Sequence, residues 1–271
     1  MLGQHPDLYA FPELNLFLTD TFAELLDWDD RPATARQYLG GLTRAIAELE
    51  FGGQDGERIE CARDWLKTHR EWQPHKIFRF LTARIAPKAL VDKSPRTSMA
   101  RTSCLRALAI VPDGRFIHLT RHPAASISSF CSTVPEKGSH VNRAFAQIWI
   151  SCQQSILNLT ETLKPAQTFL VHGEDIIRKP DETLGSVLDW LKLPSGVDII
   201  ELMKHPEMSP FAFSIPGLGA SDNDAEFLTS PRLKQPAPEP DLETVSNLDL
   251  GKSLTEQVVG LARRLGYSAC N

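Results

Sequence analysis

Arg121 stands at the end of a short apolar run, where a strand would bring its guanidinium to the start of a helix. The run from Phe116 to Leu119 is long enough for a buried strand and too short for a helix. Pro123 then suits the first position of a helix, and three serines follow it: Ser126, Ser128 and Ser129. A guanidinium, hydroxyl donors and the free N–H groups of a helix start together predict a site for an anion such as phosphate. A second interpretation is open, in which Arg121 is an ordinary surface arginine that follows a strand.

The elements around this turn alternate between strands and helices. Such alternation predicts an α/β domain with a parallel sheet and a ligand at the carboxyl ends of the strands. The predicted strands are residues 89–91, 116–120 and 168–172. The predicted helices are the apolar-periodic stretch that ends at Leu26, residues 33–50, 57–85 and 96–110, the segment after Pro123, and residues 140–163, 181–191 and 254–265. The last two of these helices are predicted to begin at caps, Asp181 and Ser253.

Residues 209–247 differ from the rest because six prolines and two glycines, Gly217 and Gly219, exclude long regular elements there. A stretch of this length within a compact domain is usually a lid or a binding loop. The alternative is a disordered linker. We therefore predict a single domain over residues 1–271, with 209–247 as a Pro-rich lid or binding loop.

The composition limits the classes of function. With 271 residues, 42% hydrophobic and 23% charged, the chain can bury one sizeable core. A net charge of −5 argues against a general nucleic-acid-binding protein, although it allows a local pocket for a small anion. The absence of an apolar run of about 18 residues predicts no membrane span, and the start shows no signal peptide. Five scattered cysteines indicate reduced thiols in a cytoplasmic protein, and their spacing predicts no metal site.

Four blocks of the sequence carry a family resemblance. They are His5 to Glu13, then Asp92-Lys93-Ser94-Pro95, then Arg115 to Pro123 with Ser129 beyond it, and finally Val171 to Pro180. In order and spacing these blocks resemble sulfotransferases that use 3'-phosphoadenosine-5'-phosphosulfate. The likeness covers nearly the whole chain and is strongest between residues 89 and 192. It most resembles the bacterial sulfotransferase domains of curacin-type polyketide synthases, with the tyrosylprotein sulfotransferases further off.

The resemblance implies a fold and a role for four residues. The fold is a P-loop-NTPase-like parallel sheet flanked by helices, and the reaction is transfer of a sulfuryl group from that donor to an acceptor hydroxyl without a metal. Arg121 and Ser129 match the pair that binds the 3'-phosphate of the donor. Glu13 matches the general base, and Lys93 matches a lysine that stabilises charge on the leaving oxygen. The implied acceptor is a small alcohol or a carrier-tethered β-hydroxyacyl chain.

Other interpretations of the same residues are open. On the residues alone, Glu13 is a helix cap or a surface acid, and Lys93 is a solvated lysine at a strand end. The segment Gly251-Lys252-Ser253 is similar to the end of a Walker A loop, which would suggest a nucleotide kinase. That motif needs a glycine where this chain has Ser246, so we interpret the segment as the start of a helix.

The sequence departs from the family at its beginning. Family members start with a strand, a glycine- and serine/threonine-rich turn and a helix, which hold the 5'-phosphosulfate just before the His-Pro-Asp block. Here His5 lies four residues from Met1, so we expect the first strand and the 5'-phosphosulfate loop to be missing. Two explanations are open. The natural protein begins further upstream and is active, or the chain is a degenerate relative that binds nucleotide or acts as a scaffold without turnover.

Overall fold

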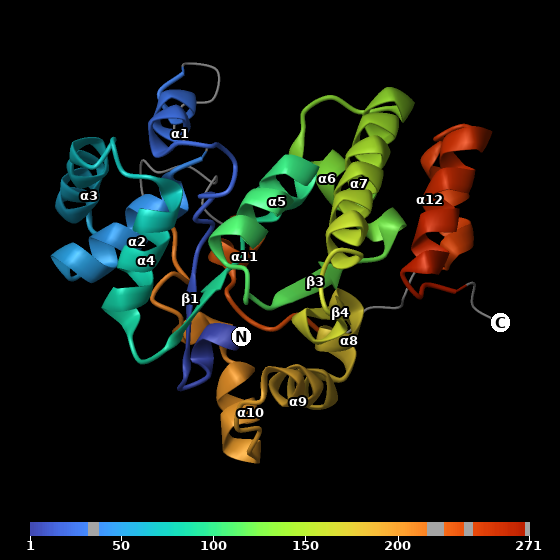
Figure 1. The fold of residues 1–271 in the computed structure, drawn as a ribbon. Helices are drawn as coiled ribbons and strands as arrows, with labels where there is room; N and C mark the ends of the chain where they lie inside the picture. The colour runs from blue at the N-terminus through green and yellow to red at the C-terminus, as the bar shows by residue number, and fades with distance from the viewer. Residues whose placement is uncertain (32–37, 216–224, 236–240, 269–271) are drawn as a thin grey trace. The chain divides into compact units, whose positions relative to one another are not determined.

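The computed structural model describes residues 1–31, 38–215, 225–235 and 241–268 of the chain (Figure 1). The chain divides into two compact units. Unit 1 comprises Met1–Thr97, Leu105–Pro112 and Leu184–Leu233. Unit 2 comprises Ser98–Cys104, Asp113–Thr183 and Lys234–Asn271.

Each unit contains a short parallel sheet. In unit 1, β1 (Leu8–Phe11) pairs with β2 (Ala89–Asp92), and Phe11 lies opposite Asp92. In unit 2, β3 (Phe116–Thr120) pairs with β4 (Thr168–His172), and Thr120 lies opposite His172. Within the described residues, each of these strands pairs with one other strand. The three predicted strands are confirmed as β2, β3 and β4, and helices flank both sheets, so the predicted α/β class is confirmed as well.

Twelve α-helices lie among the described residues. They are α1 (Phe22–Asp29), α2 (Gly40–Phe51), α3 (Gly56–Thr68), α4 (Pro74–Ile85), α5 (Arg101–Ile110), α6 (Pro123–Thr133), α7 (Ser139–Thr160), α8 (Gly173–Arg178), α9 (Pro180–Leu191), α10 (Val197–Met203), α11 (Ala225–Thr229) and α12 (Lys252–Arg264). None of them combines the length and the hydrophobicity that a membrane-spanning segment needs.

The sheet of unit 1 packs against α2 and α4. Both ends of β1 are buried, at Leu8 and Phe11. Before the strand, buried His5 accepts a hydrogen bond on Nδ1 from Asp7 N at 3.1 Å and donates from Nε2 to the Pro194 carbonyl at 3.0 Å. The histidine of the early block therefore joins the beginning of unit 1 to the end of α9.

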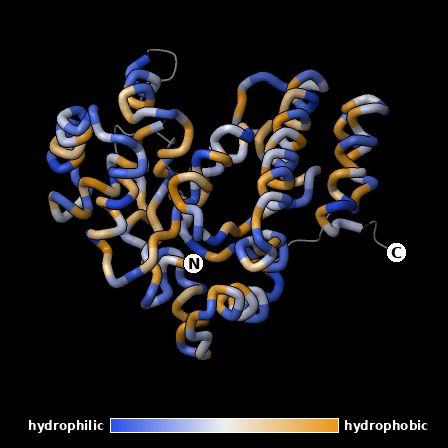
Figure 2. Tube along the Cα trace, in the orientation of Figure 1, coloured by the Kyte–Doolittle hydropathy of each residue, from blue (hydrophilic) through white to orange (hydrophobic). Residues whose placement is uncertain are grey.

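The core of unit 2 forms where α6, α7 and α12 pack together. Ile127, Trp149 and Val258 are buried there, one from each helix. Hydrophobic and hydrophilic residues alternate along the turns of α7 and α12 (Figure 2). Tyr267, just beyond α12, is also buried in this cluster.

The helix predicted through Leu26 is confirmed only as α1, which begins at Phe22. The chain before it contains β1, which ends just before Pro12 and was not predicted. A four-residue parallel strand depends on its pairing with β2, about 80 residues away, so local periodicity does not reveal it. Thr21 caps α1 by accepting a hydrogen bond from Glu24 N, and Glu24 bonds back to Thr21 N.

Several predicted helices have different boundaries. The predicted helix 57–85 is two helices, α3 and α4, because Pro74 starts a new helix. Asp181 lies in the first turn of α9, which begins one residue earlier, and so is not its cap. Ser253 is not a cap either, since α12 begins at Lys252 after Gly251, which has φ +81°. The short helices α8 and α10 lie outside the predicted helices.

The predicted lid, residues 209–247, has a packed part at each of its ends. Phe211, Ala212 and Ile215 are buried in unit 1, so this beginning of the segment belongs to its core. Later in the segment, Leu242 and Val245 are buried in unit 2. Gly217 and Gly219 lie outside the described residues, and the lid remains a prediction.

Candidate functional site

Glu13 and Lys93 meet at the carboxyl end of the sheet of unit 1. Lys93 Nζ donates a hydrogen bond to Glu13 Oε1 at 3.0 Å. The Glu13 side chain is 11% exposed, whereas the Lys93 side chain is 51% exposed. The pair therefore offers a largely buried carboxylate beside an ammonium group that solutes can reach.

The strand register brings the pair together. Phe11 lies opposite Asp92, so the residues that follow each strand leave the sheet at the same edge. Gly41, at the beginning of α2, lets that helix approach the Glu13 main chain closely. A Cβ at this glycine would lie 2.2 Å from the Glu13 carbonyl oxygen, so any larger residue would displace one of the two segments.

Asp92, the last residue of β2, is a third charged group at this edge. Its Oδ1 accepts hydrogen bonds from Leu14 N at 3.2 Å and from Ser94 Oγ at 2.7 Å. Burial raises the pKa of Asp92 to about 6, the neighbouring Glu13 carboxylate adds to this, and the two hydrogen bonds and Lys93 oppose it. Asp92 stands in one of the family blocks, but the resemblance implies no role for it.

Arg121 and Ser129 both lie in unit 2. Arg121 directly follows β3, and Ser129 lies on α6. Both residues are exposed, so their guanidinium and hydroxyl donors are accessible to an anion. The predicted helix start is confirmed, because Pro123 is the first residue of α6.

The sequence predicted free backbone N–H groups at this turn, but two of these groups donate hydrogen bonds within the chain. His122 N donates to Glu174 Oε1 at 2.8 Å, and Ala124 N donates to His122 Nδ1 at 3.2 Å. Pro123, between them, has no N–H group. An anion at this turn would therefore contact side chains, above all Arg121, rather than these backbone donors. This donor set still fits a phosphate group, since a guanidinium fork binds two of its oxygens.

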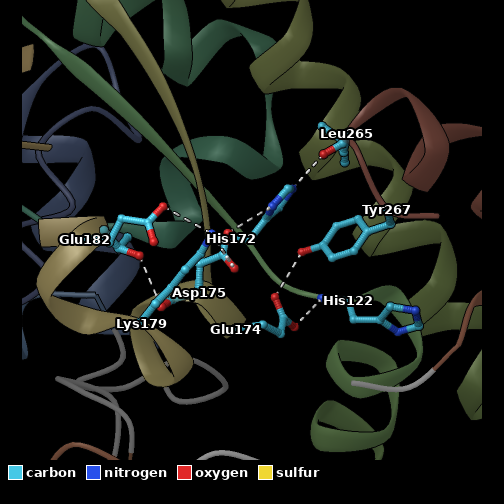
Figure 3. A network of polar contacts seen from close by, with 9 residues as sticks. His122, His172, Glu174, Asp175, Lys179, Glu182, Leu265 and Tyr267 are labelled. Atoms are coloured by element: carbon cyan, nitrogen blue, oxygen red, sulfur yellow. Dashed lines mark hydrogen bonds and ion pairs between the residues drawn. The ribbon is translucent and has the colours of Figure 1, made fainter. Parts of the chain in front are cut away.

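Glu174 lies at the centre of a polar network in unit 2 (Figure 3). Its second carboxylate oxygen accepts a hydrogen bond from Tyr267 Oη at 3.2 Å. Beside it, His172 Nε2 donates to the Leu265 carbonyl at 2.7 Å, and the rings of His172 and Tyr267 lie 4.6 Å apart. These hydrogen bonds thus hold the residues after α12 at the carboxyl ends of β3 and β4. Glu174 also stood in a family block without a role, and its place in the first turn after a strand was the only local signal.

The structure brings one pair of the predicted residues into contact. It places Glu13 in contact with Lys93 within unit 1, and Arg121 and Ser129 on consecutive elements of unit 2. Within the described ranges, no group of three or more histidine, cysteine, aspartate or glutamate side chains is arranged to hold a metal ion.

Comparisons with known proteins bear on the family and on the fold. A family model described as "Sulfotransferase family" matches residues 1–197. The structure is similar to the sulfotransferase domain from the curacin biosynthetic pathway, with a TM-score of 0.68 and 23% identity over 99% of this chain and 92% of that one. It is also similar to the sulfotransferase domain of the Synechococcus PCC 7002 olefin synthase, with a TM-score of 0.74 and 23% identity over 99% of this chain and 89% of that one. A search of curated protein sequences found no match.

Proposed function

Because the chain belongs to the sulfotransferase family, we propose that it transfers a sulfuryl group from 3'-phosphoadenosine-5'-phosphosulfate to an acceptor hydroxyl. The observation that carries this proposal is the contact between Glu13 and Lys93, with its buried carboxylate and accessible ammonium. Transfer to an alcohol needs a proton acceptor and a cation near the leaving group, and this pair supplies both.

Glu13 acts as the general base in the proposed reaction. The hydroxyl oxygen of the acceptor forms a bond to sulfur while its proton passes to the Glu13 carboxylate. The bond between sulfur and the bridging oxygen of the donor breaks, and its electron pair stays with 3'-phosphoadenosine-5'-phosphate. Lys93 stabilises the negative charge that develops on this leaving oxygen.

Arg121 and Ser129 bind the 3'-phosphate of the donor in this proposal. Their exposure and their places directly after β3 and on α6 support the assignment. The guanidinium contributes charge and two parallel hydrogen bonds, and the serine contributes a hydroxyl donor. The hydrogen bonds of His122 N and Ala124 N within the chain make these side chains the main donors.

The proposed acceptor is a small alcohol or a β-hydroxyacyl chain held on a carrier, by analogy with the polyketide relatives. A net charge of −5 supports the expectation that nucleic acid is not a partner. The scattered positions of the five cysteines in the sequence support the proposal of a reducing, cytoplasmic location.

A transfer assay tests the proposal directly. The purified chain is incubated with donor labelled with sulfur-35 and a panel of hydroxyl acceptors, both small and carrier-tethered, and labelled product is measured. We expect labelled sulfate ester from at least one acceptor. Tight binding of 3'-phosphoadenosine-5'-phosphate without transfer to any acceptor would instead indicate the non-catalytic nucleotide-binding alternative.

A further inference from the structure

The segment that carries Glu13 is fastened to the end of β2 by two hydrogen bonds from consecutive backbone N–H groups. Leu14 N donates to Asp92 Oδ1 at 3.2 Å, and Asn15 N donates to Ser94 Oγ at 3.0 Å. Ser94 Oγ in turn donates to the same Asp92 oxygen at 2.7 Å. Asp92 therefore holds Leu14 directly and Asn15 through one serine.

The same segment is constrained from the side of α2. The close approach of Gly41 leaves no room for the Glu13 main chain to move toward that helix. Asn15 has φ +55°, in the left-handed region that is uncommon for residues other than glycine. Its side chain is buried and donates from Nδ2 to the Tyr38 carbonyl at 2.9 Å. The backbone after Glu13 is thus held in an unfavourable conformation by contacts on two sides.

We infer that Asp92 is a positioning residue, which orients Glu13 toward the reacting hydroxyl by fixing the backbone of Leu14 and Asn15 through the Asp92–Ser94 pair. This inference rests on the proposed function of Glu13 as the base. A base is effective only when its carboxylate lies within hydrogen-bond reach of the proton that it removes, and a shift of about 1 Å can cost on the order of 100-fold in rate.

The contacts argue for positioning rather than for Asp92 as a second base. Its Oδ1 already accepts two internal hydrogen bonds, and Lys93 Nζ donates to Glu13. Asparagine keeps the oxygen that accepts both hydrogen bonds and removes only the charge, whereas alanine removes the acceptor. The comparison of Asp92→Asn with Asp92→Ala therefore separates geometry from carboxylate chemistry.

The first measurement is amide hydrogen exchange over residues 12–17 of the full chain, which needs no substrate. We expect Asp92→Ala to raise exchange at Leu14 and Asn15 by about tenfold or more, as lost hydrogen bonds allow local opening. Asp92→Asn should keep the wild-type protection from exchange.

Ser94→Ala is the second variant, useful if Asp92→Ala does not fold. It should raise exchange at Asn15 more than at Leu14. Asp64→Ala, which removes an exposed carboxylate of α3 that is 3.8 Å from Lys67, is the control with unchanged exchange.

The second measurement is steady-state transfer with the best acceptor. We expect Asp92→Ala to lower kcat by about tenfold or more with the KM for donor unchanged. The kcat of Asp92→Asn should stay within about threefold of the wild-type value.

Unchanged exchange at Leu14 and Asn15 in both Asp92→Ala and Ser94→Ala would overturn the inference. So would an equal loss of kcat in Asp92→Asn and Asp92→Ala, because the charge would then be what matters. A wild-type chain without transfer activity would refute the proposed function instead, and the exchange data would still decide whether Asp92 fixes the backbone.

Discussion

The two units hold their candidate residues in different ways. In unit 1 the side chains of Glu13 and Lys93 contact each other at 3.0 Å, and that of Glu13 is nearly buried. Asp92 and Ser94 hold the backbone that follows Glu13. In unit 2 Arg121 is exposed. Here the hydrogen bond to Glu174 comes from the backbone N–H of the next residue, His122. A proton transfer requires positions fixed to a fraction of an ångström, whereas a flexible cation can follow a phosphate group. We therefore expect substitutions in unit 1 to change turnover and those in unit 2 to change binding.

The largest effect is expected for Glu13→Gln. Glutamine keeps a similar shape and can still accept the hydrogen bond from Lys93, but it cannot take a proton from the acceptor. We expect kcat to fall by about 100- to 10,000-fold, the usual contribution of a general base. Calorimetry with 3'-phosphoadenosine-5'-phosphate should give the wild-type affinity. Turnover close to that of the wild type would mean that another group is the base.

Arg121→Ala should act on binding. Loss of a charge-assisted pair of hydrogen bonds should weaken the affinity for 3'-phosphoadenosine-5'-phosphate by about 10- to 100-fold. Arg121→Lys should recover part of this loss, because lysine keeps the charge without the planar fork. Arg143→Ala is the matched control, since Arg143 is another exposed arginine of unit 2. Equal affinities of Arg121→Ala and the wild type in calorimetry would refute the phosphate assignment.

Glu174→Ala tests the two hydrogen bonds that Glu174 accepts in unit 2. The variant leaves His122 N and Tyr267 Oη without their acceptor, so we expect the free energy of unfolding to fall by about 1–2 kcal/mol. Glu174→Gln keeps one acceptor oxygen and replaces the other with an NH2 donor, and Tyr267→Phe removes only the longer contact, so both should lose less stability. Urea unfolding measures the stability, and calorimetry should show a parallel loss of nucleotide affinity. A loss of stability without any change in affinity would limit Glu174 to a structural role.

The smallest effect is the pH dependence of stability that Asp92 contributes. Its pKa of about 6 in the folded protein is above the ordinary value of 3.8, so the folded state binds more protons than the unfolded state between these values. The wild type should therefore gain about 1 kcal/mol of stability, relative to Asp92→Asn, between pH 7.5 and pH 5. The gain is lost as pH rises through 6. Urea unfolding of both proteins at the two pH values measures this gain. An equal change in the free energy of unfolding of both proteins would show that burial does not raise the pKa of Asp92 in this way.

The elements that the sequence predicted well are those whose signals are local. The apolar runs that became β3 and β4 had the right length for strands, and Pro123 marked the first residue of α6. Elements whose stability comes from distant partners were missed. β1, for example, forms through its pairing with β2. The break between α3 and α4 is an exception, because Pro74 is a local signal for a helix start that the apolar periodicity obscured.

The sequence by itself determined which residue types stand after each strand, since a family block places Lys93 and Arg121 there. Only the tertiary structure decided what these residues contact. The register of β1 and β2 joins Glu13 to Lys93 across 80 positions of sequence, and the return of the chain after α12 brings Tyr267 to Glu174. Local sequence sets backbone preferences over a few residues, whereas a hydrogen bond between distant residues forms only when packing has paid the loss of chain entropy that brings them together.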